Sequence, residues 1–207
     1  MNTMRRRFRS LSAEGTEALG HALGEAVPAG TVLTLDGDLG AGKTTFVRGL
    51  ALGLGIEEGV ASPTYTLMQQ HDGGRLPLFH FDAWMEGREK ALLADGADEF
   101  LGTNGVAVIE WAGRVAPWLP SPRLAVRLRH DTLTTRWVEV EVDLGAEAEG
   151  GVDGVSAPKQ MSLQEALEGL LGGLTVPQEV EEPPAAGPLE VSGGGPEPSG
   201  PDPVEGP

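Results

Sequence analysis

The chain has 207 residues, which allows one domain of ordinary size plus additional segments. It contains no cysteine, which excludes disulfide bonds and thiolate metal sites, and no apolar run comes near the roughly eighteen residues that a membrane span needs. The first nine residues are basic but lack the apolar core of a secretory signal, so we expect a cytoplasmic protein with no membrane contact.

The charge is uneven along the chain. The net charge is -16, of which residues 145–207, with 12 acidic groups and one basic group, contribute -11. The first 144 residues are only mildly acidic and show no long basic stripe. This distribution argues against independent tight binding of RNA or DNA.

The first predicted helix follows Ser12, which can cap it, with Leu11 placed before the cap as a hydrophobic staple. Apolar residues then repeat at helical spacing as far as Ala26, and Pro28 to Gly30 end the helix. We interpret this segment as a packing helix that leads into a strand over 31–35.

A glycine-rich loop follows that strand and matches the spacing G-x-x-x-x-G-K-[ST] of a phosphate-binding loop, with a helix-like run over 46–54 behind it. Glycines let successive backbone N–H groups point at phosphate oxygens, and the helix N-terminus adds partial positive charge. The lysine is expected to bridge the β- and γ-phosphates of ATP, and the next hydroxyl to ligate Mg²⁺. The predicted nucleotide-binding residues of the loop are Gly37, Asp38, Leu39, Gly40, Ala41, Gly42, Lys43, Thr44 and Thr45.

A polar kink, Ser62-Pro63-Thr64-Tyr65, interrupts the apolar sequence that follows. Pro63 biases Ser62 toward extended backbone angles and removes one backbone donor. Two interpretations stay open: a loop that leads into a strand, or a switch segment whose Ser62 and Thr64 hydroxyls respond to the γ-phosphate.

Two apolar runs end on carboxylates. Residues 76–82 form a predicted strand that ends at Asp82, and residues 105–111 form another that closes on Glu110. The carboxyl ends of parallel strands face the ligand crevice, so Asp82 is expected beside the phosphate loop. Glu110 is interpreted as an acid at the tip of a buried strand that ligates Mg²⁺ through water or orients the attacking water, with a carboxylate that simply enters solvent as the alternative. His80 is interpreted as packed or hydrogen-bonded within its strand, with a ligand role as the alternative.

Residues 124–129 and 136–142 alternate apolar and charged side chains and predict an antiparallel hairpin with one solvated face. Arg127, Arg129 and Arg136 are interpreted as charges of that face, and Arg136 could alternatively reach the nucleotide. The predicted fold is α/β: a three-layer P-loop NTPase with a mostly parallel sheet that the hairpin extends at an edge.

The composition changes near residue 145. Residues 1–145 are expected to form the ATPase domain, and the glycine- and acid-rich stretch 146–161 a linker. A capping-box pattern at Ser162 starts a predicted helix over 162–175. Residues 176–207 are rich in proline, glycine and glutamate and are expected to be a disordered acidic tail.

These motifs together resemble the TsaE (YjeE) family, small bacterial ATPases of tRNA threonylcarbamoyladenosine synthesis. The stretches that carry the resemblance are residues 35–46, 62–66, 79–82 and 109–111. The resemblance covers roughly residues 10–145, and the helix over 162–174 could belong to it as well. The sequence Gly-Asp-Leu-Gly-Ala-Gly-Lys-Thr-Thr followed by Ser-Pro-Thr is far more specific than a generic phosphate loop.

The resemblance implies an Mg²⁺-dependent ATPase that works in a complex with the TsaD and TsaB proteins and contacts tRNA only through that complex. The assembly transfers a threonylcarbamoyl group to an adenosine beside the tRNA anticodon. The implied catalytic residues are Lys43, Asp82 and Glu110, and the implied Mg²⁺ site is Thr44 with Asp82 and Glu110. The resemblance also implies a switch that contains Ser62 and Thr64. It implies, finally, that Thr16 and Arg136 lie near the nucleotide.

Two features depart from the family pattern. The family usually continues after the aspartate with a Tyr-Arg pair, whereas Asp82 is followed here by Ala83-Trp84-Met85. The long acidic tail also has no counterpart in that pattern.

Two other functions fit the phosphate loop. A small-molecule kinase would need a lid with several basic side chains, and residues 86–104 hold only Arg88 and Lys90. A non-catalytic nucleotide-sensing module would bind ATP without releasing phosphate.

Overall fold

The computed structural model describes residues 4–85, 99–145, 157–175, 177–178 and 180–182, and of residues 157–162 the backbone alone. The strands are β1 (Arg5–Ser10), β2 (Val32–Asp36), β3 (Met68–His71), β4 (Leu78–Asp82), β5 (Val106–Glu110), β6 (Arg123–His130), β7 (Arg136–Asp143) and β8 (Val180–Glu181). The helices are α1 (Ala13–Ala26), α2 (Lys43–Gly53) and α4 (Ala157–Gly173), with short 3-10 turns η2 (Ala112–Arg114) and η3 (Ala116–Trp118).

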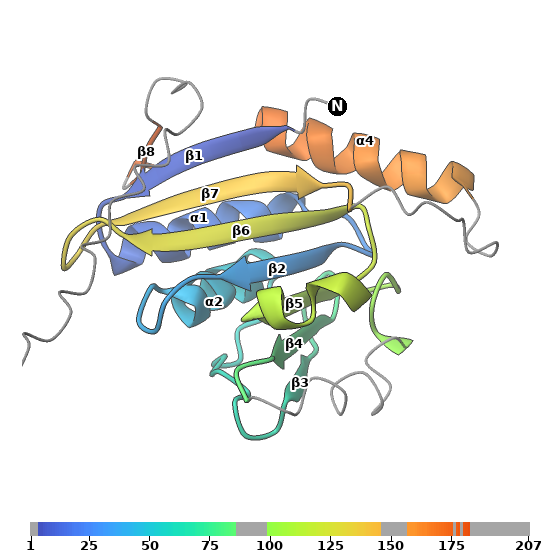
Figure 1. The fold of residues 1–207 in the computed structure, drawn as a ribbon, viewed down its shortest axis with the longest axis horizontal. Helices are drawn as coiled ribbons and strands as arrows, with labels where there is room; N and C mark the ends of the chain where they lie inside the picture. The colour runs from blue at the N-terminus through green and yellow to red at the C-terminus, as the bar shows by residue number, and fades with distance from the viewer. Residues whose placement is uncertain (1–3, 86–98, 146–156, 176, 179, 183–207) are drawn as a thin grey trace, which may run out of the picture.

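The strands form one sheet in the order β3-β4-β5-β2-β6-β7-β1-β8 (Figure 1). Four consecutive strands, β4, β5, β2 and β6, are parallel, and every other pairing in the described sheet is antiparallel. The α/β class is therefore confirmed, but the sheet is mixed rather than mostly parallel. The predicted hairpin is present as β6 and β7, yet it lies inside the sheet, because β1 and β8 continue beyond β7.

Strand β1 lies in the arginine-rich start of the chain, where the sequence had indicated only positive charge. Its side chains alternate: Phe8 is fully buried in the core, whereas Arg5 faces solvent and pairs with Glu141 of β7. On the same sheet face Arg127 pairs with Glu139 and Glu141. These ion pairs lie on the solvated face of the sheet. The alternation of apolar and charged side chains in the hairpin predicts such a face.

The helices cover one face of the sheet. The larger apolar cluster joins residues of α1, α2 and α4 to β1, β2, β4, β5, β6, β7 and β8. On the opposite face a smaller cluster packs Ala112 of η2, together with Val115 and Leu119 on either side of η3, on β2, β4 and β5. Figure 1 shows these turns in front of the sheet with α1 and α2 behind it. Among the described residues this second cover stops at β2, so the third layer is partial.

Glycines allow α1 and α2 to pack closely. A Cβ atom at Gly20 of α1 would meet the backbone carbonyl of Phe46, and one at Gly49 of α2 would meet the carbonyl of Glu17. Since Lys43 is the first residue of α2, this contact holds the phosphate loop against the start of α1. It thereby places Thr16 beside the loop.

The C-terminal elements differ from the predictions. Helix α4 begins at Ala157, so Ser162 lies inside the helix instead of capping it, and residues 157–161 are helix rather than linker. Residues Val180–Glu181, expected to be disordered, form β8 on the edge of β1, where Val180 is buried. The rest of the predicted linker (146–156), most of the predicted tail and residues 86–98, which include Arg88 and Lys90, lie outside the described residues.

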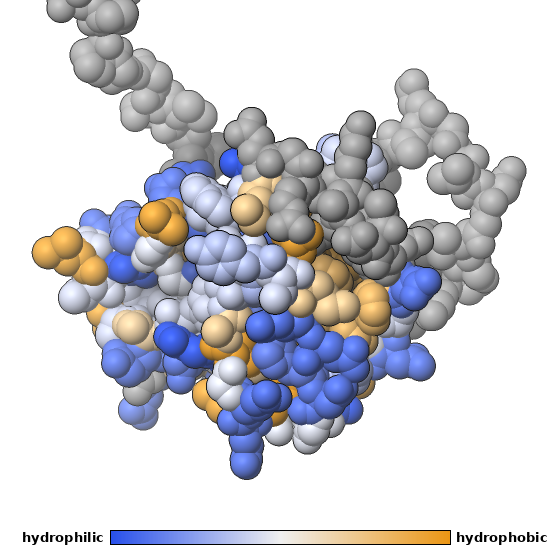
Figure 2. Space-filling model, turned by 90° about the horizontal axis from the view of Figure 1, so that it is seen from below, coloured by the Kyte–Doolittle hydropathy of each residue, from blue (hydrophilic) through white to orange (hydrophobic). Residues whose placement is uncertain are grey.

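Figure 2 views the molecule from the β3 edge, where hydrophilic side chains form a continuous area and hydrophobic ones gather in small groups. None of the described helices combines the length and the apolar character that crossing a lipid bilayer requires.

Candidate nucleotide site

The phosphate loop connects the end of β2 to the start of α2. Gly40 and Gly42 have positive φ angles of 75° and 104°, which favour glycine, and a Cβ atom at Gly37 would meet the carbonyl oxygen of Leu128. The loop therefore has the strand–loop–helix setting that its motif requires. Its backbone and the N-terminus of α2 together form a candidate anion site.

Lys43 lies inside this loop and is 5 % exposed. Its Nζ donates to the carbonyl oxygens of Gly37 at 2.6 Å and Asp38 at 3.0 Å, and it lies 3.5 Å from the centre of the Trp111 ring. Burial lowers the pKa of Lys43, and the nearby carboxylates, Glu110 foremost, offset part of that effect. To hold a phosphate, Lys43 would exchange two carbonyl oxygens for phosphate oxygens, which carry more negative charge.

The two predicted carboxylates are neighbours because β4 and β5 are parallel and pair Asp82 with Glu110. Both are nearly fully buried, at 2 % and 3 % exposure. The Thr44 hydroxyl donates to Glu110 Oε1 at 3.0 Å and lies 3.2 Å from its Oε2. The fold thus brings one hydroxyl and two acids from three separate segments to one side of the loop.

Asp82 is held by the predicted switch segment. Its Oδ2 accepts hydrogen bonds from the hydroxyls of Ser62 at 2.6 Å and Thr64 at 2.7 Å, which also lie 2.9 Å from each other. Its Oδ1 accepts from the backbone N–H of Trp84 at 2.8 Å. Residues Ser62 and Thr64 therefore contact a predicted metal ligand directly, as a segment that responds to the γ-phosphate would need to do.

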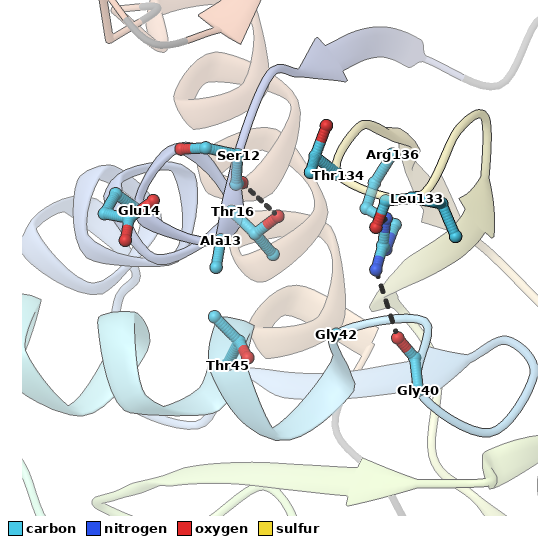
Figure 3. A pocket seen from close by; sticks show the side chains of 10 residues that line it. All are labelled: Ser12, Ala13, Glu14, Thr16, Gly40, Gly42, Thr45, Leu133, Thr134 and Arg136. Carbon is cyan, nitrogen blue, oxygen red and sulfur yellow. Dashed lines mark hydrogen bonds between the residues drawn. The ribbon is translucent and has the colours of Figure 1, made fainter.

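The loop separates two adjoining pockets. One of about 380 Å³ lies on the carboxylate side, and its lining includes Lys43, Thr44, Asp82 and Glu110. The other, of about 330 Å³, lies between the start of α1 and the β6–β7 turn (Figure 3). Residues that line both pockets are Gly40, Gly42 and Thr45.

Thr16 and Arg136 both line the second pocket, from opposite sides (Figure 3). The Thr16 hydroxyl is hydrogen-bonded to Ser10 Oγ at 2.8 Å, so its methyl group is the part that lies toward Gly42. Arg136 donates to carbonyl oxygens of the β6–β7 turn and, at 3.5 Å, to that of Gly40. Arg136 is thus a bridge between turn and loop rather than a purely solvated charge.

Several residues around the site were not foreseen as site residues. Trp111, directly after Glu110, has a positive φ of 59°, lies over Lys43 and packs its ring 4.3 Å from that of Trp84. Leu133 and Thr134 line the second pocket from the β6–β7 turn. The only sequence signal for Trp111 was its place after the carboxylate at a strand end, and the turn residues gave none.

His80 was expected to be packed or hydrogen-bonded, and both expectations are confirmed. It is fully buried, and its Nε2 lies 3.0 Å from Glu110 Oε1.

The donor atoms fit Mg²⁺. The ion prefers oxygen ligands and in phosphoryl-transfer sites is held by one or two protein oxygens together with the phosphates. Thr44 with Asp82 and Glu110 supplies oxygens of that kind. Within the described part of the chain there is no group of three or more His, Cys, Asp or Glu that would form an all-protein metal cage.

Comparison with known proteins identifies the family. The model of the family "Threonylcarbamoyl adenosine biosynthesis protein TsaE" matches residues 10–138. The chain belongs to the TsaE family. The matched span contains the phosphate loop, the switch segment, both carboxylates and Arg136. Elements α4 and β8 lie outside it.

Relatives from several bacteria carry the same name, "tRNA threonylcarbamoyladenosine biosynthesis protein TsaE". The Bacillus subtilis protein is 41 % identical over 124 residues, which cover 59 % of this chain and 77 % of the relative. The Treponema pallidum protein is 44 % identical over 120 residues, covering 58 % and 88 %. The crystal structure of Bacillus subtilis YdiB superposes with a TM-score of 0.62 at 30 % identity and covers 81 % of this chain and 96 % of that one.

Proposed function

We propose that this TsaE-family chain is an Mg²⁺-dependent ATPase that supports the threonylcarbamoyl modification of a tRNA adenosine next to the anticodon. The observation that carries the ATPase proposal is the meeting of Thr44, Asp82 and Glu110 beside the phosphate loop. Carboxylates in this position can hold Mg²⁺ and orient an attacking water, which are the two tasks that ATP hydrolysis requires. The modification pathway is the one that the relatives' names state.

Each residue of the site has a role in this proposal. The loop N–H groups and Lys43 hold the triphosphate, and Thr44 with Asp82 holds the metal, with Glu110 completing the site. Mg²⁺ supplies charge neutralisation on the phosphate oxygens when it is bound. Glu110 also orients the attacking water in line with the γ-phosphate, since the reaction depends mainly on positioning and electrostatics.

We further propose that hydrolysis depends on the TsaD and TsaB proteins, with tRNA reached through that complex in the cytoplasm, where ATP is available. None of the described residues lining the carboxylate pocket is an arginine. A site that lacks an arginine beside the γ-phosphate hydrolyses ATP slowly unless a partner supplies the missing charge.

Phosphate release from ATP with Mg²⁺, with and without TsaD and TsaB, tests the proposal. We expect slow release that the partners accelerate, and a loss of at least about 100-fold in Lys43→Ala and in Glu110→Gln, because each change removes a group aimed at transition-state charge or at the water. Glu165→Gln on the exposed side of α4 is the matched control and should keep the wild-type rate.

Two outcomes would contradict the ATPase proposal. Tight ATP binding without phosphate release, even with both partners present, would indicate a nucleotide-sensing module. ATP consumption only when a small-molecule acceptor is added would indicate a kinase.

A further inference from the structure

We propose that His80 is a positioning residue for Glu110: a hydrogen bond from its Nε2–H holds the Glu110 carboxylate in the orientation that hydrolysis needs. This inference rests on the proposed ATPase function, because Glu110 is the group proposed to orient the water and His80 holds Glu110 in place. It adds a residue that touches neither nucleotide pocket.

The contact follows from the pairing of two strands. In β4, His80 and Asp82 are two residues apart and therefore face the same side of the sheet. Glu110 ends the parallel neighbour β5, opposite Asp82. His80 Nε2 reaches Glu110 Oε1 at 3.0 Å, and the two side chains are 0 % and 3 % exposed.

The proposed role of Glu110 gives the hydrogen bond a direction. A group that orients the attacking water acts as a carboxylate, which only accepts hydrogen bonds, so the proposal places the imidazole hydrogen on Nε2. The other nitrogen, Nδ1, is buried and has no hydrogen-bond partner in the described part of the structure. The hydrogen bond to Glu110 therefore explains why a buried polar histidine ring lies in this strand. Its neighbours along the strand, Phe79 and Phe81, are buried and apolar.

Glu110 has two donors, and they come from different elements. Thr44 of α2 also donates to Glu110, and its oxygen could ligate Mg²⁺ through a lone pair while its hydrogen keeps this bond. His80 restrains the same carboxylate from β4, with a ring that lines neither pocket. Groups that orient catalytic carboxylates in this way matter for rate more than for binding of the substrate.

His71 provides a matched control in the neighbouring strand β3. It is a buried histidine, 6 % exposed, with its ring centre 6.5 Å from that of His80. Neither of its ring nitrogens has a hydrogen-bond partner among the described residues. It shares the burial of His80 but lacks the contact with Glu110.

The kinetic test compares His80→Leu, His80→Gln and His71→Leu with TsaD and TsaB present. We expect kcat of His80→Leu to fall about 10- to 100-fold with KM for ATP unchanged, since supporting residues of this kind typically have effects of that size. His80→Gln should restore most of kcat, because its side-chain amide presents a donor near the position of Nε2. His71→Leu should leave both constants at the wild-type values.

A readout that needs no activity is the nitrogen NMR spectrum of the histidine rings in the free protein. We expect His80 in the Nε2–H tautomer, with signals that shift in Glu110→Gln, whereas those of His71 should move little. Urea unfolding of each variant separates a loss of fold from a loss of rate.

Three results would overturn the inference. They are an unchanged kcat in His80→Leu, equal losses in the Leu and Gln variants, and a His80 ring whose signals ignore Glu110→Gln. If the wild-type protein releases no phosphate with its partners, the ATPase proposal itself fails, and the NMR experiment alone decides whether His80 orients Glu110.

Discussion

At the scale of single residues, the site is held by side chains that each make several contacts. Arg136 is an example, because one guanidinium joins three carbonyl oxygens of the β6–β7 turn to the Gly40 carbonyl of the phosphate loop. The same β6–β7 turn contributes Leu133 and Thr134 to the lining of the second pocket. Arg136 therefore shapes this pocket without contact to the carboxylates.

We expect Arg136→Ala to weaken ATP binding about tenfold, because a charged hydrogen-bonding group is worth roughly 1.5–3 kcal/mol and part of it is solvated here. The rate at saturating ATP should change little, since Lys43, Asp82 and Glu110 keep their contacts. Titration calorimetry with ATP, alongside phosphate release, measures both quantities. A loss of rate with unchanged affinity would show that Arg136 acts on the chemistry instead.

At the scale of elements, the packing of α1 on α2 positions the site. The two helices approach so closely that Gly20 and Gly49 leave no space for a side chain. Anything that separates them would move the N-terminus of α2, and with it Lys43 and Thr44, relative to the strand ends that carry the acids.

We expect Gly20→Ala to lower the free energy of unfolding by at least about 1–3 kcal/mol, because the added methyl group would meet the Phe46 carbonyl. Gly169→Ala in α4 is the matched control: a Cβ atom there meets nothing within 4 Å, so this change should raise stability by about 0.4–1 kcal/mol. Urea denaturation of both variants checks the pair. Equal effects would show that the helix contact is looser than its geometry indicates.

At the scale of the whole molecule, a buried arginine joins the sheet to the segment that covers it. Arg123, at the start of β6, makes two contacts with Asp143 Oδ2, at 2.8 and 2.7 Å, and donates to the carbonyl oxygens of Ala116 and Leu119. Burial raises the pKa of Asp143. The hydrogen bond from the Gly145 backbone N–H and the contacts with the Arg123 guanidinium outweigh burial, so the pKa is lowered overall.

This pair predicts a pH-dependent stability. A carboxyl group whose pKa is lowered by folding contributes stability above its unfolded pKa of 3.8 and loses it as the pH falls through its lower folded pKa. We expect Asp143→Asn to cost about 1–3 kcal/mol at pH 7, because Arg123 loses its charged partner. The difference from the wild-type protein should shrink below pH 3.8, and urea denaturation at pH 7 and pH 3 measures it. A constant difference would assign the effect to geometry rather than charge.

The sequence by itself determined the local features whose chemistry depends on adjacent residues. Gly37 to Thr45 specify a strand–loop–helix turn because only glycine tolerates its backbone angles, and apolar runs that end on Asp82 and Glu110 specify strands with acids at their tips. The family followed from the same motifs. The sequence did not predict strand β1, because most of its side chains are charged. Their alternation between the two faces of the sheet can be recognised only once the strand is paired with β7.

Only the tertiary structure decided which distant segments meet. The register of β4 on β5 sets Asp82 opposite Glu110 and brings His80 to the same carboxylate, and the close packing of α1 on α2 sets Thr16 beside Gly42. From the sequence, the segment that holds Ser62 and Thr64 could be a plain loop. In the fold, the hydroxyls of both residues donate hydrogen bonds to Asp82. Such contacts join residues far apart in the chain, so they depend on strand order and helix packing, which no local pattern of residues encodes.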